Sequence, residues 1–148
     1  MSLLVTHVVL FAVAFTAATI VPGSSELALA ASIAANPGYT ATLFVTALAG
    51  NVLGSVLNWA LGRWAAGLVG KKGFPVTPQQ LARASALFNR YGYWLLLFSW
   101  APVVGDPLTV VSGSLRINIW LFLILVAIGK AARYLIVIGG VEMVRNLV

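Results

Sequence analysis

The sequence has no cysteine, one histidine and only three acidic residues among its 148 residues. The absence of cysteine excludes disulfides, thiolate chemistry and cysteine-ligated metals. Because histidines and carboxylates are so few, we expect neither a metal site nor another cofactor. The sequence also has no Ser-His-Asp or Cys-His set and no phosphate-cradling glycine loop with a lysine. We therefore do not expect an enzyme.

Charge is scarce as well. Charged residues make up 8% of the chain, whereas soluble domains contain about 25%. Hydrophobic residues make up 61%, and the mean hydropathy is +1.00. This composition predicts an all-α integral membrane protein, and the length predicts a single membrane domain over residues 1–148.

The net charge of +6 could indicate nucleic-acid binding. The basic residues border apolar runs, however, so we expect contact with anionic lipid head groups and no nucleic-acid partner. Residues 63–90 contain several bases and no acid. By the positive-inside rule, this loop is predicted to be cytoplasmic.

Two apolar runs contain the same kind of break, at Val21–Glu26 and at Trp100–Pro107. Proline removes a backbone donor and ends a helix. Broken helices at membrane depth survive only when protein or a wet cavity surrounds them. We therefore predict two re-entrant hairpins, each with an acid at its tip. The predicted tip residues are Pro22, Gly23, Ser24 and Ser25 in the first hairpin, and Pro102, Gly105 and Pro107 in the second.

Each predicted hairpin is followed by an apolar segment of spanning length, Tyr39–Leu61 and Ile117–Gly140. The chain thus divides into repeat 1 (about 1–62), a basic loop (about 63–90) and repeat 2 (about 91–140). Each repeat crosses an odd number of times, so the second is inverted, as in many secondary transporters. Within the loop, Thr77 and Gln80 form a capping box for an amphipathic helix expected at the cytoplasmic interface.

Small and polar residues mark the first spanning segment. Asn51, Ser55 and Asn58 form one helical stripe. Interhelical hydrogen bonding is the favoured interpretation of this stripe, and substrate or ion binding by Asn51 and Asn58 is the alternative. Small residues allow close helix packing. The predicted packing residues are Gly50, Gly54 and Gly62.

Four charged residues lie within the predicted membrane region. Glu26 and Asp106 are candidates to bind a proton or cation. The alternative is that both stabilise helix N-termini, with Ser24 or Ser25 as the cap of one helix and Asp106 as the cap of the other.

The two basic candidates, Lys130 and Arg133, fall in the second half of the last apolar segment. The planar guanidinium of Arg133 suits a carboxylate or a lipid phosphate. The alternative is that the helix ends earlier and leaves both bases at the membrane interface.

Five motifs, in order along the chain, resemble the DedA/VTT (SNARE-associated) superfamily, and most closely its short YqaA-like branch. They are Pro22–Glu26, Gly50–Ser55, Asn58–Arg63, Phe88–Gly92 and Ser99–Pro107. The resemblance runs from about residue 21 to residue 134. It implies facing re-entrant hairpins in a bacterial inner membrane. It also implies movement of polyprenyl-phosphate carrier lipids with proton or sodium coupling, and eukaryotic relatives are linked to phospholipid scrambling.

The sequence also departs from that family pattern. Glu26 matches the acid of the first hairpin. The family has an acid where this chain has Ser55, and arginines where it has Ser99 and Gly105.

From these patterns we expect a membrane transporter or lipid flippase that moves an anionic lipid or a small solute. The alternative is a non-transporting membrane protein that maintains the envelope or assembles with partners. The small size of the chain also suggests a homodimer, because a single protomer offers little protein to surround the path of a lipid.

Overall fold

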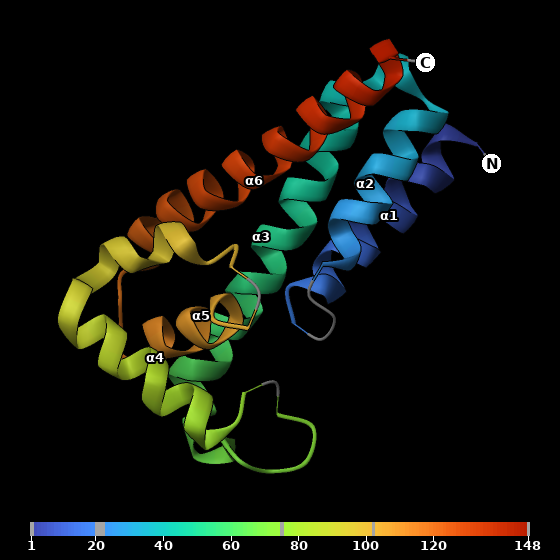
Figure 1. Cartoon of the computed structure of the whole chain (residues 1–148). Helices are drawn as coiled ribbons and strands as arrows, with labels where there is room; N and C mark the ends of the chain where they lie inside the picture. Colours follow the sequence, from blue (N-terminus) through green and yellow to red (C-terminus); the bar gives the residue numbers. More distant parts are fainter. Residues whose placement is uncertain (1, 20–22, 75, 102, 148) are drawn as a thin grey trace.

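The computed structural model describes residues 2–19, 23–74, 76–101 and 103–147. Within these ranges every regular element is helical, as the composition predicts (Figure 1). The predicted residues Pro22 and Pro102 lie outside the described residues. The elements are α1 (Leu3–Ala17), α2 (Ser24–Ala35), η1 (Pro37–Tyr39), α3 (Thr40–Trp64), η2 (Ala66–Leu68), α4 (Pro78–Tyr91), η3 (Gly92–Phe98), α5 (Gly105–Ser114) and α6 (Ile119–Leu147), where η denotes a 3-10 helix.

Two helices are long and apolar enough to cross a membrane. One is Pro37–Trp64, which is η1 together with α3, and the other is α6. They contain 28 and 29 residues. Their positions match the two predicted spanning segments, although α6 continues past Gly140 to Leu147. The alternative in which this helix ends early is therefore wrong, and both Lys130 and Arg133 lie in the interior of α6.

The first broken segment consists of α1 and α2, which have 15 and 12 residues and lie side by side against α3 (Figure 1). Their contact with α3 depends on glycine. A Cβ atom on Gly50 would lie 2.5 Å from the carbonyl oxygen of Phe11. A Cβ on Gly54 would lie equally close, 2.5 Å, to that of Phe15. Only hydrogen at these positions lets α1 approach the backbone of α3.

The second broken segment consists of η3 and α5. Its first arm is a 3-10 helix of 7 residues rather than an α-helix. It begins at Gly92, whose φ of 70° ends α4 in a conformation that glycine adopts readily. The second arm, α5, packs on α3 through reciprocal glycines. A Cβ on Gly62 would lie 1.8 Å from the oxygen of Val110, and one on Gly113 would lie 1.9 Å from that of Trp59.

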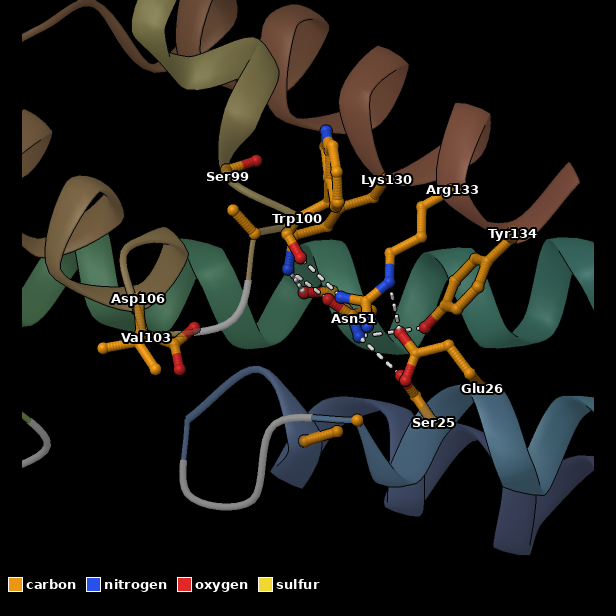
Figure 2. A pocket seen from close by; sticks show the side chains of 13 residues that line it. Ser25, Glu26, Asn51, Ser99, Trp100, Val103, Asp106, Lys130, Arg133 and Tyr134 are labelled. Carbon is orange, nitrogen blue, oxygen red and sulfur yellow. Dashed lines mark hydrogen bonds and ion pairs between the residues drawn. The ribbon is translucent and has the colours of Figure 1, made fainter. Parts of the chain in front are cut away.

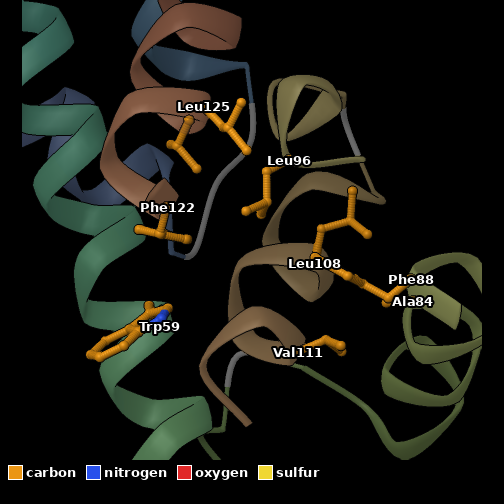
Figure 3. Packing of buried hydrophobic residues seen from close by; sticks show 9 residues of the cluster. Trp59, Ala84, Phe88, Leu96, Leu108, Val111, Phe122 and Leu125 are labelled. Atoms are coloured by element: carbon orange, nitrogen blue, oxygen red, sulfur yellow. The ribbon is translucent and has the colours of Figure 1, made fainter. Parts of the chain in front are cut away.

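Helix α4 begins at the predicted capping box, in which Thr77 and Gln80 exchange hydrogen bonds. Its apolar face packs on protein, and its place at the cytoplasmic interface stays a prediction. Ala84 and Phe88 are buried in a cluster with Leu108 and Val111 of α5 (Figure 3). An amphipathic pattern shows only that one face is covered, and here protein covers it.

The glycine contacts predict opposite effects for two substitutions. Gly62→Ala should destabilise the protein by about 1–3 kcal/mol, because its Cβ collides with the α5 backbone. Gly139→Ala on α6 is the matched control, since a Cβ there meets nothing within 4 Å. It should leave stability unchanged or raise it by up to about 1 kcal/mol. Thermal unfolding in detergent measures both, and equal losses would contradict the assigned packing.

Candidate functional site

A small polar cavity lies where α2, α3 and α6 meet the chain that leads into α5 (Figure 2). The space open to the centres of water molecules is about 30 Å³, enough for at least one water. The lining residues are Ala17, Gly23, Ser25, Glu26, Asn51, Ser99, Trp100, Ala101, Val103, Asp106, Lys130, Arg133 and Tyr134. Both broken segments therefore contribute to one cavity.

Glu26 and Arg133 form an ion pair across this cavity, with 3.0 Å between Oε1 and Nε. The side chains are 16% and 25% exposed, so the pair is largely shielded from solvent. Arg133 also donates a hydrogen bond to the carbonyl oxygen of Trp100, and its guanidinium lies 5.9 Å from the centre of that ring. One α6 side chain thus joins α2 to the second broken segment.

Lys130 is buried, with 6% of its surface exposed. Its ammonium group donates to the side-chain oxygen of Asn51 and to the main-chain oxygen of the same residue, the latter at 3.3 Å. Asn51 in turn donates to the hydroxyl oxygens of Ser25, at 3.3 Å, and Tyr134, at 2.9 Å. Asn51 therefore links α2, α3 and α6 and positions the buried cation.

Asp106 lines the same cavity from the first turn of α5. The predicted role of Asp106 as an N-cap is wrong, because α5 begins one residue earlier, at Gly105, and its N-cap is Val104. The predicted serine cap of α2 is also wrong. Gly23 is the N-cap there, with φ of 92°, and both Ser24 and Ser25 lie within the helix. Glu26 and Asp106 still lie in first turns, where the helix dipole favours a negative charge.

Two buried oxygen atoms that belong to cavity-lining residues have no hydrogen-bond partner among the described residues. They are Oε2 of Glu26 and Oγ of Ser99. A buried polar atom without a partner is costly. The cavity therefore has spare hydrogen-bonding capacity that a water molecule, a cation or a donor group of a ligand can use.

The structure brings together most of the predicted site residues, namely Glu26, Asp106, Lys130, Arg133 and Asn51. Asn58 lies apart from the cavity. It donates to the oxygen of Ala18 at 2.8 Å and to the hydroxyl of Thr109 at 3.2 Å, so it connects helices.

The other predicted tip residues named here lie either in packing contacts or in the wall of the cavity. Gly105 lies against the backbone of Ser99, where a Cβ would lie 2.0 Å from its carbonyl oxygen. Pro107 is buried within α5, and Gly23 and Ser25 line the cavity.

Sequence reasoning did not select Tyr134 or Ser99 as site residues. Tyr134 could have been found, because it follows Lys130 by four positions and so shares its helix face. The burial of Ser99 depends on the irregular path of the chain around it, which no periodic pattern reveals. No group of three or more histidine, cysteine or acidic residues close enough to hold a metal occurs in the ranges that the structure describes.

These features define a small helical membrane protein with charged groups enclosed between its helices. The VTT domain family model matches residues 8–143. The chain therefore belongs to the VTT-domain family, within the DedA/SNARE-associated superfamily.

Curated relatives agree with this assignment. The chain is 38% identical to "Inner membrane protein YqaA" of Escherichia coli K12 over 130 residues, which are 86% of this chain and 85% of the relative. The protein of the same name from Shigella flexneri gives the same values. An uncharacterized Haemophilus influenzae protein is 35% identical over 84% of this chain and 80% of its own length. No solved structure matches significantly. With its two membrane-length helices, the chain is an inner membrane protein.

The contacts of Asn51 predict a specific pattern of stability. Asn51→Leu should destabilise the protein by about 1–3 kcal/mol, because it removes the acceptor of a buried ammonium group. Adding Lys130→Met should recover part of this loss, since the uncompensated cation is then absent. Asn89→Leu, at an exposed position of α4, is the control. Thermal unfolding in detergent checks the series, and strictly additive losses would contradict the coupling.

Proposed function

We propose that this protein is a transporter or flippase that moves an anionic lipid, such as a polyprenyl-phosphate or phospholipid, or a small solute. The polar cavity carries the proposal, because its wall holds two bases and two acids at the meeting point of two broken segments. Charged side chains within a membrane protein are costly and mark ion or substrate pathways. No catalytic function is proposed.

The proposed architecture is an inverted repeat of two re-entrant hairpins, with α1 and α2 in one and η3 and α5 in the other. Two observations support this architecture, namely the lengths of the four elements and the positions of the chain termini and of the loop. Each of these elements is shorter than the roughly 20 residues needed to span a bilayer. The chain termini lie at one end of the molecule, and the loop between α3 and α4 lies at the other (Figure 1). We place this basic loop in the cytoplasm and both termini outside.

In the proposed mechanism, Arg133 and Lys130 attract the anionic group, and Glu26 and Asp106 bind the coupling proton or sodium ion. Arg133 contacts Glu26 in this structure, so an anion that binds the guanidinium competes with that carboxylate. The released Glu26 then becomes available to bind a proton or cation. Competition for one guanidinium thus couples the two binding events.

A non-transporting role in the envelope is the second candidate. One observation favours it, namely that the Glu26–Arg133 pair already joins α2, α6 and the second broken segment. In that case, the charged residues serve assembly, and a second copy of the chain is the natural partner for so small a protein.

A liposome flip assay with fluorescent phospholipid and polyprenyl-phosphate tests lipid movement against the non-transporting role. Glu26→Gln, Asp106→Asn and Arg133→Gln should each slow movement about ten- to one-hundred-fold, since a hydrogen bond to a charged group contributes about 1.5–3 kcal/mol. The matched controls are Glu142→Gln and Arg145→Gln, at exposed positions of α6.

All five variants must stay folded in thermal unfolding. Equal movement by every variant would exclude a coupling role for these residues. Movement of neither lipid by the unmodified protein would exclude lipid movement and leave solute transport or the assembly role.

The inverted repeat predicts a labelling pattern that the absence of cysteine makes easy to test. Single cysteines at Ser2 and Asn36 should react with a membrane-impermeant maleimide from the outside of intact cells. Cysteines at Gln79 and Asn118 should react only after the membrane is opened. If Asn36 and Ser2 label from opposite sides, α1 and α2 do not form a re-entrant hairpin.

A further inference from the structure

A groove separate from the polar cavity lies on the surface where α3 ends and the chain turns toward α4. It offers about 370 Å³ to the centres of water molecules, within the range of roughly 300–1,000 Å³ that is usual for ligand pockets. Its wall combines apolar side chains with two cations. The lining residues are Leu61, Leu68, Lys71, Lys72, Gly73 and Phe74.

No acidic side chain is available to neutralise the two lysines. The chain has only three acids. Glu26 is paired with Arg133, and Asp106 lines the polar cavity. Glu142 lies near the C-terminal end of α6, at the opposite end of the molecule from this groove (Figure 1). Lys71 and Lys72 are both exposed, so their charge faces outward uncompensated.

The groove also extends from the membrane-spanning helix into the loop beyond its end. Leu61 belongs to the membrane-spanning helix, whereas the lysines lie in the loop beyond its end. Trp64, at the last position of α3, is 75% exposed. Exposed tryptophan is typical of the boundary between hydrocarbon and head groups. The apolar wall therefore begins at the edge of the hydrocarbon, and the cations lie at the level of the head groups.

We propose that this groove binds one anionic phospholipid, with its phosphate on Lys71 and Lys72 and the start of an acyl chain along Leu61, Leu68 and Phe74. A soluble anion has no apolar part that could contact the apolar wall. A zwitterionic lipid carries no net charge, so two unpaired lysines attract it less strongly. Only an amphiphile with net negative charge matches both parts of the groove. The groove shares no lining residue with the polar cavity, so this site is separate from the proposed transport site.

Native mass spectrometry of the full-length protein tests this assignment. The protein is mixed with phosphatidylglycerol or with phosphatidylcholine of the same acyl chains, and retained lipids are counted. The unmodified protein should retain phosphatidylglycerol preferentially. Lys71→Gln/Lys72→Gln should weaken this retention about thirty-fold, because each lysine near head groups contributes about a five-fold factor. Arg145→Gln, which removes an exposed cation at the other end of the molecule, should change nothing.

Several results would overturn the proposal. Unchanged retention by the double glutamine variant, or an equal loss in Arg145→Gln, would show attraction by overall charge alone. Equal retention of both lipids would leave only an apolar groove, and equally effective competition by glycerol phosphate would show a site for soluble anions. If the glutamine variant unfolds, Lys71→Arg/Lys72→Arg must retain the lipid. A negative flip assay would leave this proposal intact, because retention is measured without transport.

Discussion

Direct contact between helix backbones holds both broken segments in place. Gly50 and Gly54 admit α1 to one part of α3, and Gly62 admits α5 to another part. This contact matters because α1, α2 and α5 are each shorter than the roughly 20 residues that span a bilayer. In the proposed re-entrant arrangement, protein must therefore surround the backbone groups at their inner ends. With no hydrophobic driving force between helices in lipid, close packing must supply the attraction. Helix α3 is therefore the scaffold on which the cavity is built.

The charges of the cavity depend on this scaffold. Lys130 and Arg133 come from α6, whereas Glu26 and Asp106 come from the two broken segments. An isolated charge at membrane depth is expensive, and the cost falls when a partner of opposite charge or a strong acceptor is close. Lys130 finds its acceptor on α3 itself, at Asn51, whereas Arg133 depends on Glu26 of α2 and on Trp100. Loss of a glycine contact far from the cavity would therefore affect the partners of Arg133 first.

Local signals predicted the spanning helices, the breaks and the capping box at Thr77, because run length, proline and short-range spacing act within a few residues. Rotation of one helix against another is not local. For that reason the sequence predicted a polar stripe at Asn51 but not its contacts with Lys130 and Tyr134. The cap predictions failed because both helices begin earlier than expected. Gly23, at φ 92°, is the N-cap of α2, and Val104 is the N-cap of α5. Amphipathicity likewise could not say whether lipid or protein covers α4.

The unpartnered oxygens of the cavity leave hydrogen-bonding positions open beside the ion pair. An ion pair kept only for assembly gains most when every polar atom around it is satisfied, since each orphan subtracts from its benefit. Here Glu26 gives one oxygen to Arg133, while its other oxygen and the hydroxyl of Ser99 have no partner among the described residues. Both residues line the same small cavity. The cavity admits at least one water molecule, and a water can satisfy these oxygens as well as a ligand donor can. In the proposed transport role, an entering cation or ligand donor takes the place of that water beside Glu26.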